Sequence, residues 1–238
     1  MSRIFVTGDT HGDFFHIFQF CKENNTSKED IMIICGDAGI NYYLGKRDRK
    51  LKTQIAAMPI TFLIVHGNHE ERAWNVDGYV YGAIGVGDNL LHCWFEPAYP
   101  NICFVNDFKL QEINGKRFMF IGGAYSVDKW YRIGMGYNWF ESEQITLEDM
   151  DKIIDLIYDN PNLQKVNYIV THTCPLKYEP TEVFLPGIDQ STVDKRTESF
   201  LDKIEELVNY DSWIAGHFHT NKTVDKMRFL FDDIIELG

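Results

Sequence analysis

Five short apolar runs recur along the chain, and each one ends in a turn that carries polar side chains. The runs are residues 4–6, 31–35, 60–65, 166–170 and 211–215. Apolar runs of this length, interrupted by turn residues, predict strands buried in a sheet. Apolar residues at helical spacing between them predict helices over 13–24 and 46–58, from Thr146 to Asn160, and from Ser191 or Thr192 to Leu207. This alternation predicts an α/β fold.

The middle of the chain has a weaker pattern. Residues 78–104 mix glycines with aromatic side chains, which indicates irregular chain and short edge strands. Two interpretations of these aromatics stay open, a rim over the functional site and ordinary core packing. Apolar segments at 102–105, 108–113 and 117–121 then predict a hairpin, because Asn114-Gly115 is a strong signal for a tight turn.

Length and composition restrict the class of protein. With 238 residues, 45% of them hydrophobic, we expect one domain over 1–238. No apolar run approaches the length of a membrane span, and the N-terminus enters a strand without a basic segment and a cleavable apolar stretch. The five cysteines form no Cys-x-x-Cys pair, which argues against a disulfide framework and a thiolate zinc site. We therefore expect a cytoplasmic protein without a membrane partner.

The charge balance restricts the partners further. The chain has 35 acidic residues against 23 lysines and arginines, which gives a net charge of −12. Such a surface repels polyanions, so we do not expect broad nucleic-acid binding. Any substrate that carries a phosphate must instead be attracted by a local positive centre.

The turns after the first two predicted strands carry residue types that bind metal ions. Asp9 and His11 lie two positions apart, and on extended chain they would project to the same side. Asp37 follows the second strand at its carboxyl end, where open α/β sheets place their ligands. Taken one at a time, each of these side chains has an ordinary interpretation as a turn or capping residue.

The later turns add neutral ligands. Asn68 and His69 supply an amide oxygen and an imidazole side by side. His172 follows the fourth run, and His217 and His219 form a His-x-His pair that extended chain would place on one side. Two unpaired histidines would be costly to bury, which favours a role for that pair as metal ligands.

The joint pattern is more informative than any single turn. The turns come in the order Asp-x-His, Gly-Asp, Gly-Asn-His, a lone His and His-x-His. Because neighbouring parallel strands bring their carboxyl ends together, these turns should converge on one cleft. That cleft would hold several imidazoles and carboxylates, enough for two divalent ions.

Residues 127–140 combine aromatic and basic side chains after the glycine turn at 122–126. They predict either contact with an anionic substrate or a surface loop half-buried by its own side chains. Arg132 is the favoured anion clamp because its planar fork fits phosphate in a bidentate manner, and Tyr125 is a second candidate for substrate contact.

The sequence resembles the calcineurin-like metallophosphoesterases over nearly its whole length. The similarity rests on the ordered set Gly8-Asp9-Thr10-His11, Gly36-Asp37, Gly67-Asn68-His69-Glu70, Thr171-His172 and Gly216-His217-Phe218-His219. Residues 122–126 and the aromatic stretch after them also look like small bacterial and phage members. The resemblance implies a four-layer αββα sandwich, in which two mixed β-sheets pack face to face between helices, as in metallo-dependent phosphatases. It places a two-metal hydrolytic site at one end.

The resemblance also implies a role for each residue. The first ion would be held by Asp9, His11, Asp37 and His219, and the second by Asp37, Asn68, His172 and His217. Asp37 would thus bridge the ions, and His69 would act as the acid or hydrogen-bond donor beside the leaving oxygen. The catalytic set implied is His69, Asn68 and Asp37. These mixed nitrogen and oxygen ligands suit Mn, Fe, Zn, Co or Ni better than Ca.

The sequence departs from the Ser/Thr protein phosphatases that it resembles. Those enzymes carry Gly-Asp-x-Val-Asp-Arg-Gly at the second motif and an arginine before Gly-Asn-His-Glu. Here Ile40 and Asn41 stand at the positions of that Asp and Arg, and His66 replaces the other arginine. We therefore do not expect a protein phosphatase, and Arg72 or Arg132 is the candidate to bind phosphate from elsewhere.

The expected function is metal-dependent hydrolysis of a phosphate mono- or diester by in-line attack of a metal-bridging hydroxide. The substrate would be a small phosphate ester or a nucleotide, with manganese as the ion to supply. The alternative is a non-catalytic, metal-binding interaction scaffold on the same fold, although such scaffolds usually lose ligands that are all present here. A metallo-β-lactamase fold is disfavoured because the chain has no His-x-His-x-Asp-His motif.

Overall fold

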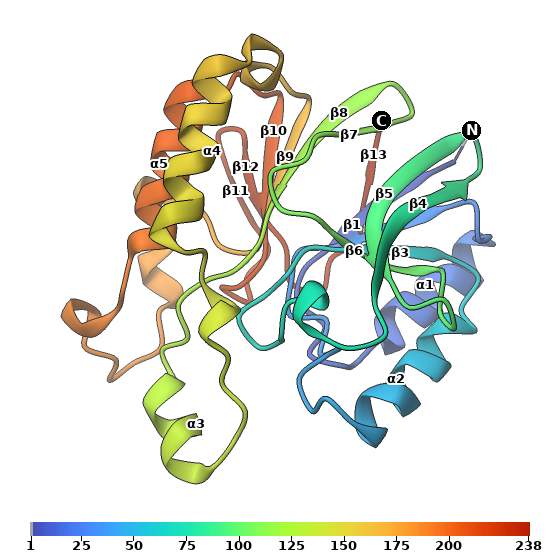
Figure 1. Ribbon diagram of the computed structural model, residues 1–238, viewed down its shortest axis with the longest axis horizontal. Coiled ribbons are helices and arrows are strands. Elements are labelled where there is room, and N and C mark those ends of the chain that lie inside the picture. Colours follow the sequence, from blue (N-terminus) through green and yellow to red (C-terminus); the bar gives the residue numbers. More distant parts are fainter. Residues whose placement is uncertain (1) are drawn as a thin grey trace.

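In a computed structural model, which describes residues 2–238, the chain builds two β-sheets that pack face to face (Figure 1). The first sheet has the order β13 (Ile235–Leu237), β1 (Ile4–Thr7), β2 (Ile31–Ile34), β3 (Thr61–Ile64), β6 (Ile102–Val105), β5 (Asn89–Phe95) and β4 (Val80–Val86). The second has the order β11 (Lys222–Val224), β12 (Met227–Phe229), β10 (Ser212–Ala215), β9 (Tyr168–Thr171), β8 (Lys116–Ile121) and β7 (Gln111–Ile113).

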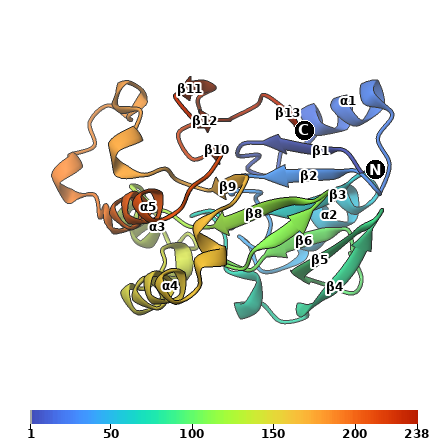
Figure 2. The ribbon, with the colours of Figure 1, turned by 90° about the horizontal axis from the view of Figure 1, so that it is seen from above.

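Helices cover both outer faces. α1 (Phe15–Asn24) and α2 (Lys46–Ala56) lie outside the first sheet, whereas α4 (Leu147–Asp159) and α5 (Arg196–Leu207) lie outside the second (Figure 1). Figure 2 shows this layering from above, with α4 and α5 on the side opposite α1. The short α3 (Lys129–Met135) and the 3-10 turns η1 (Ala73–Asn75), η2 (Glu141–Glu143), η3 (Pro161–Gln164), η4 (Leu176–Tyr178), η5 (Thr181–Val183) and η6 (Gln190–Thr192) occupy connections. The αββα sandwich of two mixed sheets is therefore confirmed.

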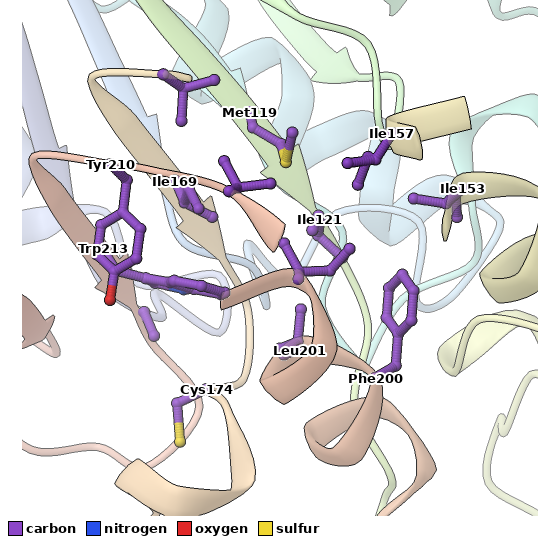
Figure 3. Packing of buried hydrophobic residues seen from close by; sticks show 14 of the residues in the cluster. Met119, Ile121, Ile153, Ile157, Ile169, Cys174, Phe200, Leu201, Tyr210 and Trp213 are labelled. Carbon is purple, nitrogen blue, oxygen red and sulfur yellow. The ribbon is translucent and has the colours of Figure 1, made fainter. Parts of the chain in front are cut away.

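Strand alternation divides the core into three layers. In β1, for example, Val6 faces the other sheet and packs with Ile214, whereas Phe5 faces α1 and packs with Ile17. The third layer lies between the second sheet and its helices, where Trp213 of β10 packs in the same cluster as residues of both helices (Figure 3). Because both faces of these strands are buried, their sequences read as continuous apolar runs.

The central strands are parallel, and this direction positions the site. β1, β2, β3 and β6 are mutually parallel in the first sheet, as are β8, β9, β10 and β12 in the second. The turns after β1, β2 and β3 therefore leave the first sheet at one edge, and the turns after β9 and β10 leave the second sheet at one edge, as the sequence predicts.

Several element boundaries differ from the prediction. Residues 78–104 include a regular hairpin, β4–β5, at the edge of the first sheet. β6 pairs with β3 in that sheet, so it does not belong to the β7–β8 hairpin, which turns at Asn114-Gly115 as predicted. The last helix begins at Arg196, because the capping signal at Ser191 belongs to the separate turn η6. Among residues 2–238 no helix is long and apolar enough to cross a membrane.

Candidate metal centre

The predicted turns meet at one end of the sandwich and are joined by backbone hydrogen bonds to carboxylates. The amide of His217 donates to Asp9 Oδ1 at 2.8 Å, and the amide of His69 donates to Asp37 Oδ1 at 2.8 Å. His11 donates its amide to the backbone oxygen of Asp37 at 2.8 Å. Each acidic residue therefore holds a turn from a distant part of the chain, and its second carboxylate oxygen is left to face the site.

One group of possible metal ligands contains Asp9, His11 and His219. The Nε2 atoms of the two histidines are 3.0 Å apart. Asp9 Oδ2 lies 3.3 Å from His219 Nε2 and 3.8 Å from His11 Nε2, and it has no hydrogen-bond partner among residues 2–238. Three donor atoms thus converge on one point.

A second group contains Asp9, Asp37 and His172, and Asn68 and His217 lie beside His172. His172 Nε2 lies 2.7 Å from Asn68 Oδ1 and 3.6 Å from Asp37 Oδ2, and its ring packs edge-on against that of His217 at 4.9 Å. Asp37 Oδ2 also lies 3.9 Å from His11 Nε2, so this carboxylate stands between the two groups. These distances agree with a bridging role for Asp37, which stays a prediction.

The donor set fits divalent cations. The Nδ1 atom of His172 donates to the carbonyl of Cys35 at 2.8 Å, so in the neutral form of the ring the lone pair of Nε2 faces the site. That lone pair then faces the amide oxygen of Asn68 at 2.7 Å, and two acceptors this close repel each other unless a proton or a cation attracts both. The close His11 and His219 nitrogens create the same requirement.

Glycines permit the turns to approach so closely. A Cβ atom on Gly36 would collide with the ring of His172, one on Gly67 with the carboxylate of Asp37, and one on Gly216 with Asp9 Oδ1. The glycine of each motif is thus required by its neighbour in space.

The local conformation differs from the one expected from sequence. His11, Asp37, His217 and His219 all have positive φ values, from 46° to 67°, so neither Asp-x-His nor His-x-His is extended chain. Their side chains converge because tight left-handed turns aim them, not because of alternation along a strand. The left-handed region costs about 1–2 kcal/mol for a residue with a Cβ atom, and the hydrogen bonds to Asp9 and Asp37 hold the turns in it.

Electrostatics keep the carboxylate ionised and two of the rings neutral. Burial opposes ionisation of Asp37, but the nearby imidazoles of His172, His69 and His11 outweigh it and hold the pKa of Asp37 below its usual range. Burial holds the pKa of His217 well below its usual value and also lowers the pKa of His11. Ionised carboxylates and neutral imidazoles are the forms that bind divalent ions.

A network that sequence reasoning missed orients Asn68. Its Nδ2 donates to Ser126 Oγ at 2.8 Å, which turns Oδ1 toward His172. The Ser126 hydroxyl in turn donates to the buried carboxylate of Glu143, which pairs with Arg132 at 2.7 Å. The sequence contains no motif that indicates a role for Glu143, although it indicates Arg132 and the turn that carries Ser126.

The proposed substrate-binding arginines are both buried in ion pairs. Arg72 pairs with Asp107 and donates to the carbonyl of Ser142 at 2.8 Å. Arg132 is 2% exposed and lies 3.1 Å from Asp128 besides its contact with Glu143. These contacts occupy the guanidinium groups, so the structure gives them bracing positions, and direct phosphate binding by either stays an untested prediction. Tyr125 lines a cavity beside the centre.

The departures from the protein-phosphatase motifs have a structural counterpart. Ile40 is fully buried in the core between the first sheet and its helices. Asn41 accepts a hydrogen bond from the Tyr79 hydroxyl at 3.1 Å, and His66 stacks on Phe104 with 4.9 Å between ring centroids. These positions therefore serve packing, whereas the ring of His69 lies 5.6 Å from that of His11 at the centre.

Comparison with known proteins agrees with the fold and the motifs. The family model described as calcineurin-like phosphoesterase matches residues 2–221. The chain therefore belongs to this family, whose members generally bind divalent metals and hydrolyse phosphate esters. A comparison with curated proteins finds no match.

Solved structures give distant matches. One crystal structure has a TM-score of 0.50 at 12% identity, and the alignment covers 96% of this chain and 89% of the other. The phosphopantetheinyl hydrolase of Mycobacterium tuberculosis has a TM-score of 0.48 at 12% identity, covering 97% and 88%. The protein AQ665 of unknown function from Aquifex aeolicus has 0.39 at 14%, covering 99% and 96%. At sequence identities this low, the match with a TM-score of 0.50 supports the fold alone, and the two matches with lower TM-scores add no support.

Proposed function

We propose that this chain hydrolyses phosphate esters with the help of two divalent ions, drawn from Mn, Fe, Zn, Co and Ni, held by side chains of the candidate metal centre. The ligands are Asp9, His11, Asp37, Asn68, His172, His217 and His219. The observation that carries the proposal is that one imidazole of each donor group approaches the same carboxylate oxygen, since Asp37 Oδ2 lies 3.9 Å from His11 Nε2 and 3.6 Å from His172 Nε2. When bound, such ions lower the pKa of a water molecule and neutralise charge on the phosphoryl oxygens.

The protein's own residues position the substrate and move the proton. Asp37 accepts a hydrogen bond from the backbone of His69, so the proposed bridging ligand and the proposed proton donor are held together. The imidazole of His69 is half-buried beside His11, where it protonates the leaving oxygen of the ester. Asn68, braced by Ser126, contributes an uncharged oxygen without adding negative charge near the phosphate.

The substrate we propose is a small phosphate mono- or diester or a nucleotide, acted on in the cytoplasm. The guanidinium groups of Arg72 and Arg132 are both paired with carboxylates, so the positive charge that attracts the phosphate would have to come from the ions held by the ligand residues. The acidic net charge of −12 disfavours a long polyanion.

The test is turnover by the purified protein with added manganese, on 4-nitrophenyl phosphate and bis(4-nitrophenyl) phosphate. His69→Ala should reduce kcat by about 10²–10⁴ while bound metal stays unchanged. Asp37→Asn should remove both turnover and bound metal. The matched control is His92→Ala, because His92 is an exposed histidine on the distant β5.

The outcomes separate the enzyme from the scaffold. Unchanged turnover in both variants would contradict the assigned roles. Bound manganese without turnover on either ester class would favour a metal-binding interaction scaffold.

A further inference from the structure

A cavity of about 370 Å³ opens directly from the centre. One end is formed by the candidate ligands and His69, and the other by apolar side chains. These are Tyr125, Val127, Val183, Phe184, Leu185, Ile188, Val193 and Phe218. We use the name apolar wall for Val183, Phe184, Leu185, Ile188 and Val193 of this lining. A group attached to a phosphate at the centre would lie against it.

The apolar wall is tied to the ligand turns. The ring of Phe184 stacks on that of Phe218 with 6.1 Å between centroids and 18° between planes. Phe218 lies between His217 and His219 in sequence, so the apolar surface begins within one residue of two candidate ligands. A phosphate at the centre therefore places the first carbons of its ester group beside these rings.

The apolar wall leaves part of its surface exposed. Leu185 is 64% exposed and Val183 is 38% exposed, although both border a cavity. A cavity of roughly 150 Å³ is enough to hold benzene, so this one has room for a group of several carbons. Burying these side chains under a ligand would gain free energy in proportion to the apolar area removed from water.

The charges that line the cavity disfavour a second anionic group. Among residues 2–238, Lys195 is the one lysine or arginine of the lining, and it pairs with Glu179 at 2.6 Å. Glu198 is 4% exposed, accepts from the Thr173 hydroxyl at 2.9 Å and leaves Oε2 without a partner among those residues. An anionic group in the cavity would therefore find no lysine or arginine of the described lining that is free of an acidic partner.

A second cavity at the centre has a more polar lining. It measures about 480 Å³, shares His11 and His69 with the first, and is lined by Arg47, Asp48 and Lys50 of α2 together with Tyr42 and Tyr43. The polar parts of a substrate have a better place there than against the apolar wall. The two cavities thus distinguish two sides of one phosphate.

Resting on the proposed function, we infer that the substrate is a phosphate ester with an uncharged, mainly apolar group of several carbons that occupies the cavity at the apolar wall. This specificity separates the substrate from free nucleoside polyphosphates and from esters of small polar alcohols.

Binding of phosphonates to the manganese-loaded protein, measured by calorimetry, tests the inference without turnover. Methylphosphonate, butylphosphonate and 3-phosphonopropionate share the phosphonate and differ in the attached group. Butylphosphonate should bind roughly tenfold or more tightly than methylphosphonate because of its three additional methylenes. The carboxylate of 3-phosphonopropionate should remove that gain.

Equal affinity for the methyl and butyl compounds, tightest binding of 3-phosphonopropionate, or no binding of any phosphonate would each overturn the inference. Leu185→Asn, a change of similar shape at an exposed position, should reduce the preference for butyl over methyl by about threefold or more. Leu147→Asn is the control, because Leu147 is 62% exposed on α4 outside the cavity.

The phosphonate result and the turnover result are independent. Turnover of 4-nitrophenyl esters without a butyl preference would leave the proposed function intact and refute the apolar-group specificity. A preference for the butyl over the methyl compound without turnover would support the apolar-group specificity and refute the proposed function.

Discussion

The turns that carry the candidate ligands and the apolar wall face each other across one cavity, but they hold their shapes by different means. The ligand turns are joined to one another by hydrogen bonds between distant segments, such as those from His217 to Asp9 and from His69 to Asp37. The segment that carries the wall contains short 3-10 turns whose backbone hydrogen bonds are local, as from Val183 to Pro180 and from Thr192 to Asp189. Long-range bonds fix geometry for chemistry, whereas a locally bonded segment can change its side chains at low cost.

Two buried carboxyl groups show the same contrast. Asp37, among imidazoles, has its pKa held below the usual range, although burial alone would raise it. Glu198, beside the apolar wall, has its pKa raised to about 7, chiefly by burial. The first environment therefore favours a carboxylate that binds cations, and the second favours a carboxyl group without charge.

Removal of the ions should have the largest effect on turnover and on stability. The ions would be held by the ligand turns, whereas the apolar wall would hold none. A chelator should abolish turnover completely. If free manganese had been a hundredfold above its Kd, unfolding would become easier by about 2.7 kcal/mol. Thermal unfolding with and without chelator should show a decrease in Tm of about 5–10 °C. A Tm that does not respond would mean that the ligand turns are stable without ions and bind none.

The next largest difference between the ligand turns and the apolar wall should come from replacing one glycine by alanine in each. Gly67→Ala places a Cβ atom against the carboxylate of Asp37, and we expect a loss of about 3 kcal/mol in unfolding free energy. Gly187→Ala has no atom within 4 Å but a φ of +87°, so the expected loss is about 1 kcal/mol. Urea denaturation measures both. Equal losses would show that the wall is as tightly constrained as the ligand turns.

Arg132→Lys should weaken the brace of Asn68 while keeping the charge. A lysine cannot reproduce the contacts of the guanidinium with both Glu143 and Asp128, so manganese affinity should decrease by about 10–100-fold. The control is Arg49→Lys on the exposed face of α2. If phosphonate affinity falls but manganese affinity does not, Arg132 is a phosphate clamp as the sequence suggested.

The smallest expected effect is a pH dependence of stability that comes from Glu198, beside the apolar wall. The pKa of Glu198 in the folded protein is above its unfolded value, so the unfolded state loses this proton first as the pH rises. Stability should therefore fall by about 1 kcal/mol between pH 6 and pH 7 from this group, and become independent of it above the folded pKa. Glu198→Gln should remove that slope. Parallel stability profiles of wild type and variant would contradict the raised pKa.

Much of the fold was accessible from the sequence because buried parallel strands leave a simple signal. Continuous apolar runs such as residues 31–35 are long enough to identify, and the turn after each run carried its motif. Residues 78–104 were predicted only as irregular chain and short edge strands, because β4 carries glycines such as Gly82 and exposed side chains such as Tyr81 and buries Val86 alone.

The residues of the centre were predicted better than their conformation or their support. The sequence named the seven candidate ligands, which the structure brings together at one edge. It did not reveal the left-handed backbone of His11 or His217, since a residue's φ depends on its neighbours in space. Glu143 was missed for the same reason, because its contact with Ser126 exists only after folding.

The last residues of the chain lie beside the first ligand turn. β13 pairs with β1, and the hydroxyl of Thr7 donates to the backbone of Asp233, 226 residues away. A ribosome releases β1 long before this partner is synthesised. The edge of the first sheet beside Asp9 is therefore completed only when β13 has been synthesised and has paired with β1.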